Sequence, residues 1–201
     1  MNLYNKRFVP WLLNREMGDA EFSETRELVV GSAKGVVLEI GFGPGYNLPF
    51  YSGVERLYAL EPSRELYEYA TERIKGVSFP IESLFCGAEQ IPLPDSSVDS
   101  VVSTWTLCSV SDVQKVLSEI RRVLKPSGTF LFVEHGLSPK QPNATIQKVA
   151  TPVTKYFTGN CRMDRNIELL ITNAGFRIDE ITKAPEDGRP LMFSYRGIAR
   201  K

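Results

Sequence analysis

Long hydrophobic runs are absent from the 201-residue chain, since the N-terminal stretch FVPWLL is too short for a signal-peptide core or a membrane span. Basic runs of the kind that bind nucleic acids are absent as well, and 24 Lys and Arg residues balance 24 Asp and Glu residues. This balance argues against DNA or RNA as a substrate. We therefore expect a soluble, cytoplasmic protein with no integral membrane segment and no nucleic-acid partner.

Cysteine and histidine are also scarce. Cys86, Cys108 and Cys161 are odd in number and widely spaced, they form no CxxC or Cys/His metal pattern, and His135 is the only histidine. A reducing compartment fits this cysteine usage best, and no metal site is expected. Cys86 and Cys108 are expected to be small buried hydrophobic side chains, whereas Cys161 falls in an irregular segment where exposure is expected.

The rest of the composition, 42% apolar and 24% charged, is typical of a globular protein, and the length favours one domain spanning residues 1–201. Hydrophobic periodicity predicts alternating strands and helices. The strands are predicted at 36–40, 56–62, 77–85, 98–105 and 129–135, and the helices at 20–33, 63–76, 111–128 and 164–175. Residues 176–185 and 191–201 read as an antiparallel hairpin. We predict an α/β fold with a Rossmann-like, doubly wound, seven-stranded sheet, mostly parallel with a C-terminal antiparallel hairpin.

Several local signals refine this expectation. Pro80 indicates an edge position for the third strand, and Ser63 is the expected N-cap of the helix that follows the second. Ser111 and Gln114 have the spacing of a capping box at the start of the next helix. Residues 136–163 show no clear period.

Three glycines fall within five positions directly after the first strand, in VVLEIGFGPGYN. Gly41, Gly43 and Gly45 depart from the G-x-G-x-x-G fingerprint of dinucleotide-binding turns, because Tyr46 stands where the third glycine belongs. Pro49 forbids an intact helix after the turn, so the clean helix N-terminus that a pyrophosphate prefers is missing. No G-K-[ST] follows, which excludes a Walker A loop.

Two acidic residues lie near this turn, each at the end of a predicted strand. In open α/β sheets, ligands bind beyond the carboxyl ends of the strands. Glu61 ends the second strand, where a carboxylate can accept two hydrogen bonds from ribose hydroxyls. Glu39 ends the first strand and is suited to orient a cationic group. The residues therefore predict a ligand that carries a ribose and a cationic group but no pyrophosphate.

The segments LEIGFGPGYN, LEP, GAEQIPLPDSSVDSVVS and RVLKPSGTFLFVEH together resemble the class I S-adenosylmethionine-dependent methyltransferases over nearly the whole chain. Within that family, TLCSV, FVEH and GNCRMDRN look most similar to the small-molecule thiol S-methyltransferases of the methyltransferase-like 7 group. The broader neighbours are the quinone-biosynthesis C-methyltransferases.

The resemblance implies S-adenosylmethionine as cofactor and S-adenosylhomocysteine as product. Its implied binding residues are Glu39, Gly41, Phe42, Gly43, Gly45, Asn47, Glu61, Pro62, Ala88, Glu89, Thr104 and Trp105. Gly87 departs from the family pattern, because relatives commonly place there an Asp or Asn that holds the adenine amino group. Backbone groups of Ala88 and the Glu89 side chain would serve instead. A second departure is the lack of the N-terminal membrane anchor that the thiol methyltransferases carry, and a soluble protein is therefore expected.

The implied reaction moves a methyl group to a small, partly apolar acceptor: a thiol, a phenol or a quinol. His135 follows the fifth strand on the ligand side of the sheet, where a general base would act on a phenol or carbon acceptor. A thiol would need little base assistance. Residues 1–33 and 136–163 are expected to form a lid over the site. The alternatives are a catalytically silent cofactor-binding module and a nicotinamide-dependent oxidoreductase, against which Tyr46 argues.

Overall fold

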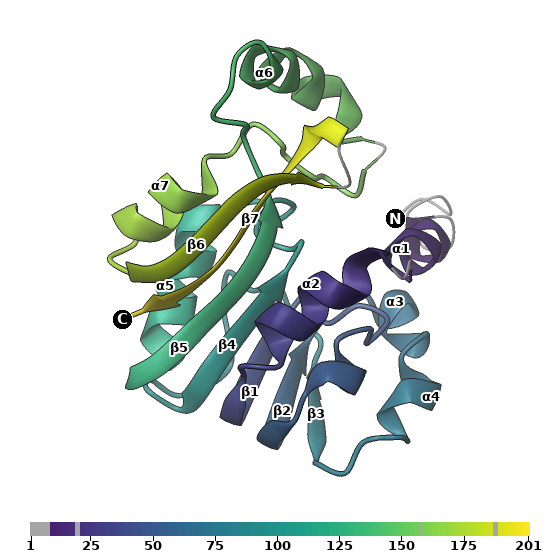
Figure 1. Ribbon diagram of the computed structural model, residues 1–201. Helices are drawn as coiled ribbons and strands as arrows, with labels where there is room; N and C mark the ends of the chain where they lie inside the picture. The colour runs from purple at the N-terminus through teal and green to yellow at the C-terminus, as the bar shows by residue number, and fades with distance from the viewer. Residues whose placement is uncertain (1–8, 19–20, 157, 187–188) are drawn as a thin grey trace.

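The computed structural model describes residues 9–18, 21–156, 158–186 and 189–201, and it is built around a seven-stranded sheet (Figure 1). The strands are β1 (Lys34–Ile40), β2 (Gly53–Leu60), β3 (Ile81–Leu84), β4 (Val98–Thr104), β5 (Leu124–His135), β6 (Arg177–Glu186) and β7 (Arg189–Arg200). Their order is β3-β2-β1-β4-β5-β7-β6. The first five are parallel, and β7 is antiparallel to both β5 and β6. This confirms the predicted fold class.

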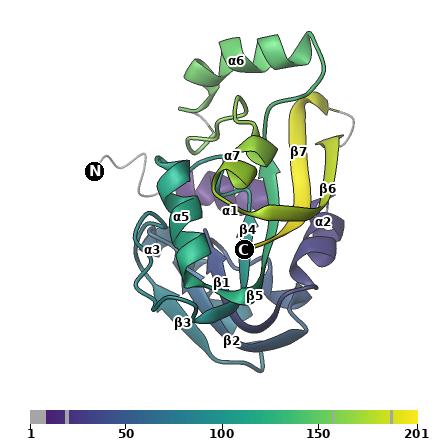
Figure 2. The same ribbon diagram turned by 90° about the vertical axis from the view of Figure 1, so that its left-hand side faces the viewer.

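Helices cover both faces of the sheet. One face carries α2 (Glu21–Val30), the 3₁₀ turn η2 (Leu48–Phe50), α3 (Arg64–Glu68) and α4 (Thr71–Ile74), and the other carries α5 (Val113–Val123) and α7 (Ile167–Asn173). Two more helices, α1 (Val9–Met17) and α6 (Asn143–Thr154), lie toward the carboxyl ends of the parallel strands (Figures 1 and 2). None of the helices in the described ranges is long and apolar enough to cross a membrane.

The core splits into two layers because strand side chains alternate between the faces. Leu38 and Ile40 pack with the apolar stripe of α5, whereas Val37 packs with α2. Each fully buried Leu or Ile contributes roughly 1.5–3 kcal/mol relative to an exposed one. Glu39 lies on the α2 face yet is almost completely buried, which is costly for a carboxylate unless partners compensate.

Strand order reverses between β1 and β4, which lie side by side. From β1 the chain continues through β2 and β3 to one edge of the sheet, and from β4 it continues through β5 toward the other edge. Open α/β sheets bind their ligands at such a point, beyond the carboxyl ends of the strands. The glycine turn leaves β1 there, and Thr104 and Trp105 leave β4 there.

Several predicted boundaries are wrong in detail. The segment 136–163, in which no helix was predicted, contains the helix α6. Pro152 lies inside this helix, and a proline normally argues against a helix. The predicted helix 63–76 is two short helices, α3 and α4. The predicted capping box is also wrong, because Asp112 rather than Ser111 is the N-cap of α5 and accepts the Lys115 N–H.

Two strand predictions also need correction. The third strand is shorter than expected and begins at Ile81, although its edge position is as predicted and Pro80 immediately precedes it. The fifth strand is longer and begins at Leu124, where a pairing irregularity opposite β4 accommodates Pro126 and Gly128. The predicted cap of Ser63 is confirmed, because its side chain accepts the Leu66 N–H.

Candidate active site

The three glycines of the turn after β1 share a left-handed backbone but differ in the space around them. All three have left-handed backbone angles, with φ of +68° at Gly41, +54° at Gly43 and +75° at Gly45, a region that costs other residues roughly 1–2 kcal/mol. A Cβ at Gly41 would overlap the Thr106 side chain, and one at Gly45 would press on Ala70. A Cβ at Gly43 would make only ordinary contacts, 3.7 Å from Leu66 and 3.8 Å from the Gly41 carbonyl. Gly43 is therefore the one of the three where a Cβ would overlap no neighbouring atom.

A buried carboxylate lies beneath this turn. Glu39 accepts hydrogen bonds from the Tyr51 hydroxyl (2.7 Å) and from Nδ2 of Asn47 (2.8 Å). Nδ2 of Asn47 also donates to Oγ1 of Thr104 (3.0 Å), which links the ends of β1 and β4. Burial outweighs these hydrogen bonds and the nearby Arg26 charge, and it raises the pKa of Glu39 to about 7. A cationic ligand beside Glu39 would favour its ionised form.

Two buried polar atoms at this place have no partner in the described structure. They are Oδ1 of Asn47, an acceptor, and Nε of Arg26, a donor. An orphaned buried group costs about 1–3 kcal/mol, so such groups commonly await a ligand. An acceptor beside Glu39 and a donor on Arg26 match the ammonium and carboxylate of an amino acid. The methionine end of S-adenosylmethionine therefore fits the groups present.

Arg26 is a site residue that sequence analysis missed. Its guanidinium carbon lies 5.0 Å from the centroid of the Trp105 ring and 5.6 Å from that of Phe22, and Nη2 donates to the Met17 carbonyl (2.9 Å). Burial lowers the pKa of Arg26 to about 10, although Glu39 counteracts the shift. An arginine in a helix usually faces solvent, so nothing in the sequence of α2 marked this one.

Glu61 joins the second strand to the glycine turn. One of its oxygens accepts the Gly43 N–H (3.0 Å) and the other accepts the Ser63 N–H (2.8 Å). Burial raises the pKa of Glu61 in spite of these two donors. The carboxylate is thus fixed beside Gly43 and keeps further lone pairs for ribose hydroxyls. The next residue, Pro62, is exposed.

The other predicted cofactor residues divide between packing and the site. Phe42 is buried against Tyr67, with ring centroids 5.4 Å apart, and Ala88 belongs to the core on the α5 face. The Glu89 carboxylate lies where a side chain at Gly87 would stand, because a Cβ there would come within 2.7 Å of its Oε2. A carboxylate therefore occupies the place that an acidic residue at position 87 would fill.

Trp105 sits at the end of β4 in a strained conformation. Its φ is +52°, which a tryptophan rarely adopts, and its N–H donates to the Val133 carbonyl (2.7 Å). The indole Nε1 donates to Glu186 (3.0 Å), and the Phe22 ring packs edge-on at 4.8 Å. Strain of this kind clusters at functional sites. The structure thus places Trp105 directly after Thr104, which Asn47 links to Glu39.

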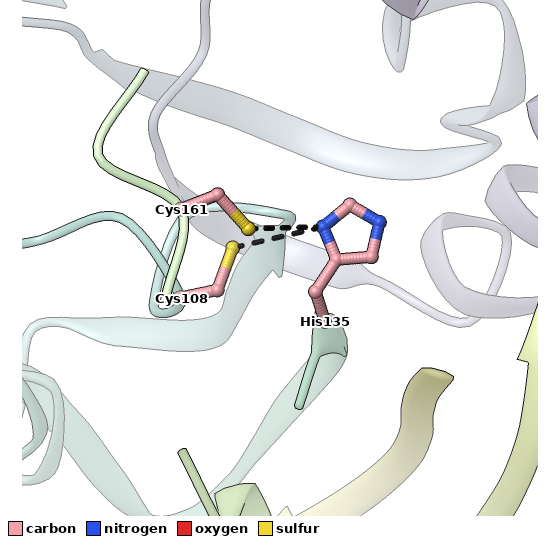
Figure 3. A group of neighbouring side chains, drawn as sticks. All are labelled: Cys108, His135 and Cys161. Carbon is pink, nitrogen blue, oxygen red and sulfur yellow. Dashed lines mark hydrogen bonds between the residues drawn. The ribbon is translucent and has the colours of Figure 1, made fainter. Parts of the chain in front are cut away.

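His135 ends β5 and contacts three groups, of which Figure 3 draws Cys108 and Cys161. Its Nδ1 lies 3.4 Å from Sγ of Cys161 and 4.0 Å from Sγ of Cys108, and its Nε2 lies 3.0 Å from the Glu186 carboxylate. Burial alone would lower the pKa of His135, but the hydrogen bonds to Cys108 and Glu186 raise it to about 10. An imidazole that keeps its proton at neutral pH is a poor general base. The expected exposure of Cys161 is wrong, because Cys161 is buried.

Glu134, fully buried next to His135, organises the turn that follows β4. It accepts hydrogen bonds from the Ser103 hydroxyl (2.5 Å), the Thr106 N–H (3.1 Å) and the Cys108 N–H (3.1 Å). Burial raises the pKa of Glu134 against these donors. The carboxylate therefore fixes the path from the end of β4 to Cys108. Sequence analysis gave Glu134 no cofactor or catalytic role, and in the structure its hydrogen bonds hold the turn between β4 and Cys108 in place.

The described structure contains two cavities, of which one borders the candidate site. One of about 200 Å³ lies between α2 and strands β5, β6 and β7, and its lining includes Phe22, Glu186 and Ser194. A larger one of about 490 Å³ lies beside α5, at Ser118 and Arg122, and touches no predicted site residue. The smaller cavity therefore matters for the site, because Glu186 borders both the cavity and His135.

The fold is of the Rossmann-like class, and the candidate site lies at the carboxyl ends of its parallel strands. Residues 38–132 match the family model of a methyltransferase domain. The chain is 31% identical to a human thiol S-methyltransferase, TMT1B, over 90% of this chain and 80% of that protein. It is 29% identical to human TMT1A, also a thiol S-methyltransferase, over 94% and 86% of the two chains.

Solved structures agree on the fold. A S-adenosylmethionine-dependent methyltransferase from Aquifex aeolicus superposes with a TM-score of 0.65 at 22% identity, covering 94% of this chain and 97% of the other. The chain belongs to the S-adenosylmethionine-dependent methyltransferase family, and it is similar to the thiol S-methyltransferases within it.

Proposed function

We propose that the protein binds S-adenosylmethionine at the carboxyl ends of β1, β2 and β4 and transfers its methyl group to a small thiol. The similarity to two thiol S-methyltransferases over 90% or more of the chain carries this proposal. The unpartnered Asn47 and Arg26 atoms support the cofactor half independently. When bound, the cofactor supplies an activated methyl group on a sulfonium, so the protein need not generate an electrophile.

The chain's own residues then hold the cofactor at both ends. Oδ1 of Asn47 and the Glu39 carboxylate face the methionine ammonium, and Arg26 faces its carboxylate. Glu61 accepts from the ribose hydroxyls, and Gly43 lets the backbone approach without a side chain in the way. Glu89, above Gly87, receives the adenine amino group in place of the acidic residue that relatives carry there.

A thiol acceptor suits the other half of the site better than a phenol or quinol does. Thiols ionise near neutral pH and need little base assistance. Phenols have a pKa near 10 and would require a base, and both ring nitrogens of His135 are already engaged, one by the Glu186 carboxylate and the other by the two cysteine sulfurs. Trp105 and Phe22, which pack edge to face, supply apolar surface that excludes water from the transfer. The expected lid of residues 1–33 and 136–163 stays a proposal, and in the described part of the chain its helices α1 and α6 lie toward the carboxyl ends of the parallel strands.

The test incubates the protein with S-adenosylmethionine and matched panels of alkyl thiols, phenols and quinols, and mass spectrometry measures the methylated products. Methyl thioethers are the expected products. Glu39→Gln, which keeps the shape and removes the charge, serves as the paired variant and should weaken S-adenosylhomocysteine binding by calorimetry. Methylation of phenols or quinols with none of thiols would overturn the thiol assignment. Cofactor binding without turnover on any panel would return the chain to a silent binding module.

A further inference from the structure

The fold brings together three potential metal ligands that lie far apart in the sequence. His135 is 27 residues from Cys108 and 26 from Cys161 along the chain. Yet Sγ of Cys108, Sγ of Cys161 and Nδ1 of His135 all lie within 4.8 Å of one another. Figure 3 shows both sulfur atoms pointing at the same ring nitrogen. No spacing motif announces this group, which is why sequence analysis predicted no metal site.

The distances match a tetrahedral zinc centre. With Zn–S bonds of about 2.3 Å and Zn–N bonds of about 2.05 Å, a tetrahedron separates sulfur from nitrogen by about 3.6 Å. The two observed separations, 3.4 Å and 4.0 Å, bracket that value. Shifts of a few tenths of an ångström would therefore seat the ion.

The far side of His135 is prepared for ligation. Its Nε2 lies 3.0 Å from the Glu186 carboxylate, which accepts a hydrogen bond from the Nε2–H and leaves Nδ1 to face the sulfur atoms. A histidine that ligates a metal nearly always donates its other N–H to a carboxylate or carbonyl. Glu186 is itself held by the indole of Trp105 and the Ser194 hydroxyl. A disulfide between Cys108 and Cys161 would explain neither the nitrogen at the sulfurs nor the carboxylate behind it.

Hydrogen bonds to backbone groups of Cys108 and of its neighbours hold the two cysteines close together. Glu134 accepts the Cys108 N–H, and the Arg162 N–H donates to the Cys108 carbonyl (2.8 Å). Nδ2 of Asn160 donates to the Ser109 carbonyl (2.6 Å). These contacts join the residues on either side of Cys161 to the turn that carries Cys108. The two thiols are both at least nine-tenths buried.

We propose that Cys108, His135 and Cys161 bind one Zn²⁺ ion, whose fourth position takes the thiol of the methyl acceptor. Two thiolates neutralise the ion, and sulfur with imidazole nitrogen is the donor set that zinc favours. Among the described residues the group has no fourth protein ligand, as in catalytic zinc sites. The site is next to the cofactor turn, since Thr106, two residues before Cys108, contacts Gly41.

The second half of this inference rests on the proposed function. A thiol bound to zinc loses its proton to solvent and remains a nucleophilic thiolate. One sulfur lone pair forms the new bond to the methyl carbon, while the bond from that carbon to the sulfonium breaks and its electron pair stays on the departing sulfur. The products are a neutral methyl thioether and S-adenosylhomocysteine. A thioether is a weaker ligand than a thiolate, so the product leaves the metal.

The first test measures the metal itself, on wild-type protein purified under reducing conditions without chelators. Elemental analysis should find about one zinc per chain. After chelation and reloading with Co²⁺, thiolate-to-cobalt charge-transfer bands and tetrahedral d–d bands should appear. Cys108→Ser, Cys161→Ser and His135→Asn should each weaken or abolish these bands, whereas Cys86→Ser, outside the group, should keep them. Circular dichroism controls for folding.

The second test separates the metal from the reaction. Metal-free protein should keep its affinity for S-adenosylhomocysteine but lose at least tenfold in thiol methylation, and zinc should restore it. Wild-type protein without zinc or cobalt bands, or with a Cys108–Cys161 disulfide by mass spectrometry, would overturn the site. Methylation unchanged by metal removal would overturn the acceptor role. Stoichiometric zinc in a protein that methylates no thiol would instead reject the proposed function and leave the metal site standing.

Discussion

The cofactor half and the acceptor half of the candidate site are built in opposite ways. The cofactor half comes mostly from one stretch, residues 36–63, in which Glu39, the three glycines, Asn47 and Glu61 follow one another around β1 and β2. The acceptor half collects Trp105, Cys108, His135, Cys161 and Glu186 from four separate segments, since Trp105 and Cys108 share the turn after β4. Residues that lie close together in the sequence form a recognisable motif, whereas residues that only the fold brings together do not.

Gly43→Val should have the largest effect and should confine it to the cofactor half. The φ of +54° means that valine strains the turn, and its side chain would take up room proposed for the ligand, while the added Cβ makes only ordinary contacts with Leu66 and the Gly41 carbonyl. We expect S-adenosylhomocysteine affinity to fall more than about a hundredfold, with the fold retained. Calorimetry measures the affinity and a thermal melt measures the fold. Normal binding would show that the turn holds no ligand.

Glu61 offers the next largest effect, and the structure changes what to expect from it. The carboxylate holds the Gly43 and Ser63 N–H groups as well as the proposed ribose, so Glu61→Ala should lose stability along with affinity. Hydrogen bonds to a charged group contribute about 1.5–3 kcal/mol, which corresponds to a loss of roughly 10- to 150-fold in cofactor affinity. Glu61→Gln, which keeps an acceptor oxygen, is the matched control. An affinity within twofold of wild type in Glu61→Ala would remove Glu61 from the ribose site.

Glu186→Gln tests the acceptor half with a change of one charge. It keeps the size of the side chain but weakens the carboxylate behind His135. Loss of such a partner commonly costs 10- to 100-fold in metal affinity or activity. We expect thiol kcat/KM to fall by about that factor and S-adenosylhomocysteine affinity to stay within threefold of wild type. If instead cofactor affinity collapses and acceptor kinetics do not, the division into two halves is wrong.

The same division explains what the sequence could predict. The buried runs of β1, β4 and β5 and the glycine turn are local patterns, and all were found. Arg26 and Glu186 were missed because a charged residue in a helix or at a strand end is normally solvated, and only the tertiary fold buries Arg26 and partly buries Glu186. Cys161 was placed wrongly because its burial depends on hydrogen bonds from Arg162 and Asn160 to residues more than 50 positions away.

Helix boundaries failed for a related reason. Pro152 lies inside α6, where a proline removes one hydrogen bond, and the sequence around it lacks strong apolar periodicity. Contacts with β7 hold α6 in place instead. Local propensity is a weak guide wherever tertiary packing supplies the stability. Tertiary packing of this kind stabilises α6, whereas local sequence patterns already mark the region around β1.

The smallest effect we predict is the pH dependence of cofactor binding, and it tests Glu39. The pKa of Glu39 in the free protein is raised to about 7 because the carboxyl is buried. A carboxyl with a raised pKa binds more protons folded than unfolded, so its contribution to the unfolding free energy falls as pH rises from about 4.5 to about 7. A cationic ligand favours the carboxylate, so binding should release this proton and strengthen with pH. We expect S-adenosylhomocysteine affinity to rise by up to about tenfold between pH 6 and pH 7 and to level off above 8. Calorimetry in buffers of different ionisation enthalpy counts the released protons. Glu39→Gln, which cannot titrate, should flatten this rise; a slope that persists in the variant would assign the proton to another group and remove Glu39 from the ammonium site.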